Sequence, residues 1–281
     1  MGHGVDDTSV KSAANKAAQH HLIVAAFEHA AFPVALGFVA GFVDIFGFMG
    51  LFGLLPAHVT GNLIFIAVDI ARQQYNLIMK IAALPIFAVS VAISAWLIGT
   101  LSARERHPFV PMVLLQAAVL GLSLIAGLLM PAATSPDDAT VAVVGSTMLF
   151  AMAVQNTVMR LILNNLPPTT IMTGNITHMV AEGVRLAAGF GAAATPAEAS
   201  MLARRAHRIG LALVSFTAGA IVGGLVQLHV GYIGLLAPIA ALLILIPIGR
   251  NEMRAVAKFE HRGGGNATGR SHGVLIIHRE E

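Results

Sequence analysis

The chain has 281 residues, of which 56% are hydrophobic and only 11% are charged. Soluble domains carry about 25% charged residues, so the composition excludes an ordinary soluble protein. The net charge of +3 comes without a basic stripe interleaved with aromatic residues, which excludes nucleic acid as a partner, and the absence of cysteine excludes disulfides and thiolate metal sites.

Long uncharged runs follow one another along the chain. A helix needs about 20 apolar residues to cross a bilayer. Six runs predict such spans: 32–54, 78–101, 110–131, 141–163, 209–229 and 231–249. An N-terminal segment, 1–31, precedes them, and within it residues 10–30 favour an amphipathic helix on the membrane surface. A polar tail, 250–281, follows them and is expected to be mobile. The predicted fold class is therefore an all-α polytopic membrane protein.

Two shorter apolar segments, Thr60–Gln73 and Thr173–Ala187, meet charged residues before they are long enough to span. Each follows a stretch that contains proline and begins with the motif Thr-Gly-Asn. Proline disfavours a helical conformation in the residue before it, so each stretch interrupts the helices on either side. We expect two half-helices.

The chain also repeats itself. Five positions match at an offset of 113 residues: Thr60-Gly61-Asn62, Asp69 and Arg72 against Thr173-Gly174-Asn175, Glu182 and Arg185. With a slip of one residue, Gly41-Phe42-Val43-Asp44 matches Ala153-Val154-Gln155-Asn156. The repeats cover 32–131 and 141–249. Each holds three spans, an odd number, so the second repeat is expected to be inverted relative to the first.

Lys and Arg in the loops set the orientation, because cytoplasmic loops carry an excess of them. With both termini in the cytoplasm, only Arg72 and Lys80 of the 17 basic residues lie outside, which leaves 17 − 2 = 15 inside. The sequence therefore predicts cytoplasmic N- and C-termini.

The Thr-Gly-Asn motifs are the first candidate binding residues: Thr60, Gly61, Asn62, Thr173, Gly174 and Asn175. A helix start exposes unpaired N–H groups and the positive end of the helix dipole. In an inverted repeat, two such starts near the bilayer midplane face each other across a site for an anion or polar solute. The alternative is surface helices capped by Thr or Asn. The six apolar residues Leu63–Val68 favour burial on every side of the first half-helix, whereas Thr177 and His178 fit the surface alternative better.

Asp44 is the one acid within a predicted span away from its ends. A carboxylate at mid-membrane costs at least about 2.5–3.5 kcal/mol, so it must face protein or water. Asp44 is either a proton or cation site or a solute ligand, or it is an internal hydrogen-bond acceptor that ties two helices together. Gln155 and Asn156 occupy the matching place in the second repeat, as solute contacts or as polar packing between helices.

The remaining polar residues predict no chemistry. Asp69 and Arg72, like Glu182 and Arg185, lie three positions apart, which favours ion pairs within each half-helix. The 12 histidines lack the spacing of metal ligands, and no nucleophile–base pattern or phosphate loop is present. No metal, cofactor or enzymatic activity is expected.

The motifs Gly41-Phe42-Val43-Asp44, His58-Val59-Thr60-Gly61-Asn62, Gln155-Asn156 and Thr173-Gly174-Asn175 resemble the YoaK family of bacterial inner-membrane proteins, domain of unknown function 1275. The resemblance covers roughly residues 30–250. It implies a multi-pass protein of the bacterial inner membrane and supplies no substrate.

Together these patterns predict a permease or channel-like protein for a small polar or anionic solute, with the bilayer as its other partner. The opposed half-helices form its site and Asp44 is its proton-coupling group. The alternative is a membrane scaffold or sensor that does not transport, and a membrane-embedded enzyme comes third. The oligomeric state stays open, a homo-oligomer included.

Overall fold

The computed structural model describes residues 29–73, 77–104, 106–188 and 196–264. Within these ranges every regular element is helical and no strand occurs. The helices are α2 (Ala31–Gly50), α3 (Val59–Ala71), α4 (Ile78–Ala103), α5 (Phe109–Leu129), α6 (Ala139–Leu161), α7 (Met172–Ala188), α8 (Pro196–Val230), the 3₁₀ helix η1 (Gly231–Leu235) and α9 (Leu236–Gly264). The predicted all-α class is confirmed, and the two short helices α3 and α7 lie at the Thr-Gly-Asn motifs.

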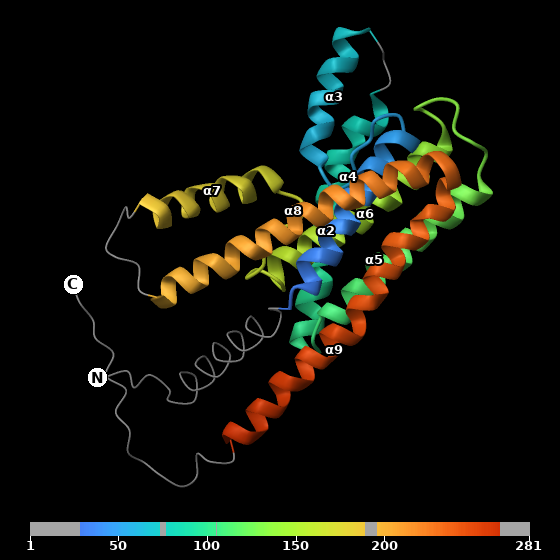
Figure 1. Cartoon of the computed structure of the whole chain (residues 1–281). Coiled ribbons are helices and arrows are strands. Elements are labelled where there is room, and N and C mark those ends of the chain that lie inside the picture. Colours follow the sequence, from blue (N-terminus) through green and yellow to red (C-terminus); the bar gives the residue numbers. More distant parts are fainter. Residues whose placement is uncertain (1–28, 74–76, 105, 189–195, 265–281) are drawn as a thin grey trace, which may run out of the picture.

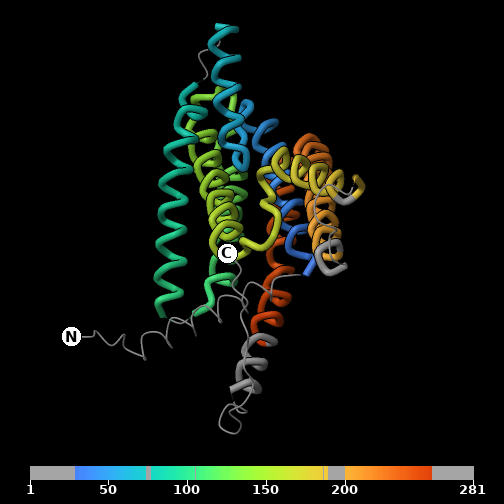
Figure 2. The backbone as a smooth tube through the Cα atoms, turned by 90° about the vertical axis from the view of Figure 1, so that its left-hand side faces the viewer, coloured from blue at the N-terminus to red at the C-terminus, as the bar shows by residue number. Residues whose placement is uncertain are grey.

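The long helices α2, α4, α5, α6, α8 and α9 run alongside one another, while α3 projects from one end of the bundle (Figures 1 and 2). By length and hydropathy, five segments are candidate membrane spans. The fifth, Ser200–Arg254, is 55 residues long and contains α8, η1 and α9. At η1 the chain reverses direction, so α8 and α9 form a hairpin (Figure 1). Gly231 begins this turn with a φ of +61°, a conformation that glycine adopts without strain.

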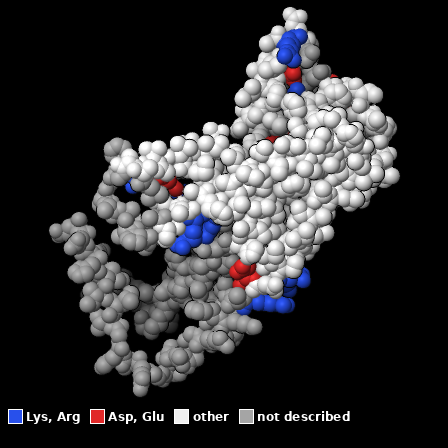
Figure 3. All heavy atoms as spheres, viewed as in Figure 1, with Lys and Arg blue, Asp and Glu red and all other residues white. Residues whose placement is uncertain are grey.

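The helices α2 and α6 form the centre of the bundle. In each, 67% of the residues in the most apolar stretch of the helix are buried, compared with 22% in α4. The outer helices instead expose large apolar side chains, among them Trp96, Leu129, Val214 and Leu228. Figure 3 shows a broad uncharged face with charged residues gathered toward its ends. Apolar surface of this extent matches the hydrocarbon of a bilayer rather than water.

The contacts between helices come in matched pairs. The helix α2 packs against α8 as α6 packs against α4, and α5 packs against α6 as α9 packs against α2. Likewise α3 packs against α4 as α7 packs against α8. The pattern is therefore unchanged when the series α2–α3–α4–α5 is exchanged with α6–α7–α8–α9.

Glycines bring the backbones of α2 and α8 into direct contact. A Cβ on Gly41 would clash with the carbonyl oxygen of Phe216, and a Cβ on Gly219 would clash with that of Phe38. These residues belong to two Gly-x-x-x-Gly patterns, Gly37 with Gly41 and Gly219 with Gly223. Small residues at this spacing allow membrane helices to pack closely. The contact between α2 and α8 was not predicted from the sequence, although these patterns indicate such packing.

The short helices lie at the outside of the bundle. In α3 only Val59, Asn62 and Asp69 are buried, while Leu63 and Ile64 are exposed. The burial on every side expected for Leu63–Val68 is therefore not provided by the described residues. Phe65 packs against Phe48 of α2, with ring centroids 5.2 Å apart, while Leu63 and Ile64 face outward, where the surroundings of the protein must cover them.

Helix boundaries differ from the sequence prediction at the C-terminal half. The helix α8 starts at Pro196, well before the predicted start at residue 209, and α9 continues beyond residue 249 to Gly264. Both helices thus continue into polar residues, beyond the ends of the apolar runs from which their bounds were predicted. The predicted surface helix over 10–30, apart from its last two residues, and the tail after 264 lie outside the described residues.

Candidate functional site

Asp44 holds the break between α2 and α3. Its Oδ1 accepts hydrogen bonds from the backbone N–H of Ala57, at 2.6 Å, and of His58, at 3.2 Å. Its Oδ2 pairs with Nδ1 of His58. The Asp44 side chain is buried, and the ring of His58 meets the ring of Phe216 on α8 edge-on, with centroids 5.4 Å apart. The carboxylate is therefore fully engaged in fixing the amino end of α3.

These bonds draw the chain back into the bundle after α2 has ended. Asp44 lies six residues before Gly50, which corresponds to about 9 Å along the helix axis. Because His58 precedes α3 and is bound at the level of Asp44, α3 begins about 9 Å inside the end of α2.

Asn62 closes the same break from the other side. Its Oδ1 accepts from the N–H of Leu55, at 2.8 Å, and its Nδ2 donates to the carbonyl oxygen of Leu55, at 3.0 Å. Asn62 is buried, whereas Thr60 is exposed and no side chain caps α3. The motif asparagine therefore fastens the preceding chain, and the alternative of a helix start capped by Thr or Asn does not apply to α3.

The second break is held by the same spacing of bonds. Oδ1 of Asn156 accepts from the hydroxyl of Thr170, at 2.5 Å, a separation of 14 residues that equals the separation from Asp44 to His58. Nδ2 of Asn175 donates to the carbonyl of Pro168, at 2.7 Å, seven residues upstream as Leu55 is from Asn62. The two breaks thus share one design.

Gln155 is wholly buried and joins three helices to the second break. Its Nε2 donates to the carbonyl of Leu36 on α2, at 2.8 Å, and to Thr169 Oγ1, at 3.0 Å. Its Oε1 accepts from Nε2 of Gln116 on α5, at 2.7 Å. Gln116 and Thr169 were not predicted from the sequence, although a lone glutamine in an uncharged span indicates a hydrogen bond between helices.

The acids of the two short helices pair with the helix that follows, and the expected pairs within each helix are wrong. Asp69 on α3 binds Lys80 on α4, at 2.5 Å, with both side chains largely buried. Glu182 on α7 binds Arg205 on α8, at 3.0 Å, with Arg205 55% exposed. Each short helix is thereby fastened to its successor, which among the described helices is the long helix with which it makes extensive contact.

The predicted site residues fall into two groups. Asp44 and Asn62 lie at the first break; Gln155, Asn156 and Asn175 lie at the second. The helices α3 and α7 share no extensive contact, and Thr60 and Thr173 are exposed. Near Gly61 and Gly174, only side-chain atoms would meet an added Cβ, so neither glycine lies against another backbone.

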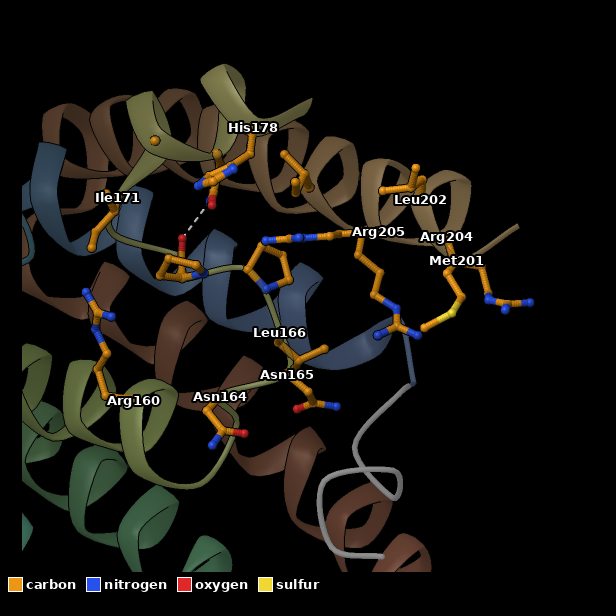
Figure 4. A pocket seen from close by; sticks show the side chains of 16 residues that line it. Arg160, Asn164, Asn165, Leu166, Ile171, His178, Met201, Leu202, Arg204 and Arg205 are labelled. Carbon is orange, nitrogen blue, oxygen red and sulfur yellow. Dashed lines mark hydrogen bonds between the residues drawn. The ribbon is translucent and has the colours of Figure 1, made fainter. Parts of the chain in front are cut away.

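A pocket of about 880 Å³ adjoins the second break. Gly174 and Asn175 line it, together with the arginines Arg160, Arg204, Arg205 and Arg208. Figure 4 shows Arg160, Asn164 and Asn165 on one side of the pocket and His178 and Arg205 on the other. The pocket was not predicted from the sequence, in which these arginines indicated only the orientation of the loops. Among the described residues, no group of three or more His, Cys, Asp or Glu is placed to hold a metal ion.

The long apolar helices, whose exposed apolar side chains suit contact with lipid, define a helical membrane protein. Over residues 32–248 the chain matches the model of the family described as protein of unknown function (DUF1275), and it belongs to that family. The resemblance seen in the sequence motifs is thus confirmed. No curated protein and no solved structure matches the chain.

Proposed function

We propose that this protein is a permease of the bacterial inner membrane for a small polar or anionic solute. The observation that carries the proposal is the pair of breaks held by equivalent hydrogen bonds, 14 and seven residues apart in each half. Hydrocarbon cannot satisfy irregular backbone, so breaks at membrane depth occur where they are buried in protein or line a cavity. Transporters place such paired interruptions at their binding sites.

The proposal includes six crossings, made by α2, α4, α5, α6, α8 and α9, in two inverted repeats. The matched pairs of helix contacts support it, because a two-fold relation between the repeats requires each contact to recur with the roles exchanged. Three crossings per repeat then turn the second repeat upside down. The basic loop residues favour cytoplasmic N- and C-termini.

The candidate residues take separate roles in this proposal. Asn62, Gln155, Asn156 and Asn175 hold the breaks in shape, as their buried hydrogen bonds indicate. Thr60 and Thr173, which are exposed, and the backbone of Gly61 and Gly174 are left to contact the solute. Asp44 both fixes the first break and, as a buried carboxylate next to a histidine, is the candidate proton-coupling group.

Osmotic swelling of proteoliposomes tests transport before any substrate is known. Vesicles are shocked in turn with hyperosmotic potassium phosphate, glycerol 3-phosphate, lactate, glycerol and urea, and light scattering follows their recovery. We expect at least one solute to restore vesicle volume faster than it does in protein-free liposomes and in liposomes that hold an unrelated helical membrane protein. Equal recovery in all three preparations for every solute would overturn the permease and favour a scaffold or sensor.

A further inference from the structure

The basic pocket beside the second break is built from four separate parts of the chain. Arg160 comes from the last turn of α6, Asn164 and Asn165 from the break, His178 from α7, and Arg205 from α8. Such convergence of polar side chains from several elements on one hollow is typical of ligand sites. The pocket's volume of about 880 Å³ lies within the range of small-molecule sites, about 300–1,000 Å³.

The charge of the pocket is one-sided. Among the described residues, its lining includes four arginines and no acidic residue. Glu182 binds Arg205 from beside the pocket. Like charges that share a hollow raise its positive potential and attract anions. The guanidinium group also presents a planar fork of donors that matches the oxygens of phosphate.

The fold itself does not require so many cations. With the one-residue slip that matches Asp44 to Asn156, Arg160 corresponds to Phe48. The ion pair with the acid of the short helix matches Arg205 to Lys80, so that Arg204 and Arg208 correspond to Met79 and Ala83. The first half of the protein therefore has the same kind of break with one cation in place of four. The excess of positive charge lies at one end of the proposed repeat, which faces the cytoplasm in the proposed orientation.

The lining also has an apolar part. Leu166 and Ile171 from the break, and Leu202 and Ile209 from α8, border the pocket beside the polar groups. A bare inorganic ion would leave this part of the volume unused. An organic molecule with a small uncharged body and a doubly charged end fits both parts.

We propose that the pocket binds the phosphate group of an organic phosphate ester through Arg160 and Arg205. The inference rests on the proposed function only in identifying the bound ester with the transported solute; binding itself does not depend on transport. The same phosphate chemistry has two sources, a soluble ester in the cytoplasm and the headgroup of an anionic phospholipid. The phospholipid headgroup is retained as a source because Val180 and Val184 on α7 are apolar and exposed, which suits contact with the membrane boundary.

Calorimetric titration of the full-length protein, purified in lipid-free detergent, with glycerol 3-phosphate tests the binding. We expect saturable binding that weakens at least tenfold in Arg160→Gln and in Arg205→Gln. Arg205→Lys should recover only part of the loss, because lysine keeps the charge without the fork. The matched control is Arg104→Gln, an exposed arginine at the end of α4 outside the pocket, which should bind as the wild type does. Thermal unfolding of each variant verifies that it is folded.

The source of the phosphate is decided in nanodiscs. If glycerol 3-phosphate binds equally well in phosphatidylcholine and in phosphatidylglycerol discs, the ligand is a soluble ester; if phosphatidylglycerol displaces it, the site takes a headgroup. Either result supports a phosphate site. Absence of saturable binding together with no effect of phosphatidylglycerol, or equal binding by wild type and both glutamine variants, would overturn it. Binding without any osmotic swelling would instead remove the permease and leave the phosphate site standing.

Discussion

Asn62 and Asn175, which lie at the same position of the two Thr-Gly-Asn motifs, each donate a side-chain hydrogen bond to the carbonyl oxygen seven residues upstream. The two residues whose carbonyl groups accept these bonds differ in one respect. Leu55 also has a backbone N–H group, which donates a hydrogen bond to Oδ1 of Asn62, whereas proline at position 168 has no N–H group. The asparagine of the first motif consequently makes two bonds to the backbone of its break, and that of the second motif makes one.

This difference predicts unequal effects of alanine substitution. A buried hydrogen bond contributes about 0.5–1.5 kcal/mol. We expect Asn62→Ala to lower the free energy of unfolding by about 2–3 kcal/mol and Asn175→Ala by about 1 kcal/mol. Equilibrium unfolding in mixed micelles measures both. A loss for Asn175→Ala as large as that for Asn62→Ala would contradict the assignment.

The glycine contact between α2 and α8 predicts a second contrast. An added Cβ at Gly41 or Gly219 meets the backbone of the opposite helix, and backbone cannot move aside as a side chain can. Overpacking of this kind costs about 1–3 kcal/mol or more. Gly99 and Gly121 are the matched controls, because nothing lies within 4 Å of an added Cβ there. We expect Gly41→Ala and Gly219→Ala to lower the thermal midpoint clearly and the control alanines to leave it unchanged or raised.

The buried pair between Lys80 and Asp69 predicts strong dependence on both partners. Lys80→Met leaves the Asp69 carboxylate buried without its cation, which costs about 3–5 kcal/mol. The double variant Asp69→Leu with Lys80→Met should recover most of that loss. Arg205→Gln, in the pair with Glu182 whose arginine is 55% exposed, should cost less than Lys80→Met does. Unfolding free energies of the four proteins verify the order, and a small loss in Lys80→Met would show that the pair is not buried in the native protein.

Substitutions of Asp44 distinguish its role in fixing the first break from a role in coupling transport to protons. Asp44→Asn keeps an oxygen that can accept from Ala57 and His58, so we expect a loss of only about 1–2 kcal/mol. Asp44→Leu removes the acceptor and should destabilise more. If Asp44 couples transport to protons, Asp44→Asn abolishes the response of uptake to an imposed pH gradient, with a solute that swelling identifies. Wild-type uptake and gradient dependence in Asp44→Asn would restrict Asp44 to the structural role.

The proposed inverted arrangement predicts which loops are accessible from each side. Because the chain has no cysteine, single cysteines label without background. Cysteine at Ser135, between α5 and α6, should react with an impermeant maleimide on intact cells. Cysteine at Ser200 on α8, or at Ser271, should react only after permeabilisation. Labelling of Ser200→Cys in intact cells would place both repeats the same way up.

The sequence predicted the order of the elements because that order follows from local signals. Runs without charge mark the long helices, and proline with Thr-Gly-Asn marks the breaks. The motif also identified Asn62 and Asn175 as special positions. Their actual bonds were not predictable, because a cap within the helix and a tie to the preceding loop use the same residue types.

The partners across helices were beyond the sequence. Asp69 has Arg72 one turn away, yet it binds Lys80, which tertiary packing brings alongside. Arg160 is more than 40 positions from Arg204, so their common pocket appears only once α7 and α8 are folded back over the break. Exposure of α3 was missed because an apolar run has the same composition whether protein or lipid covers it.

The exchange of helix contacts means that neither half of the chain contains the packing partner of its own central helix. The helix α2 finds α8 in the second half, and α6 finds α4 in the first. A chain cut in the loop between α5 and α6 would thus yield two fragments that are each incomplete, and that assemble when produced together.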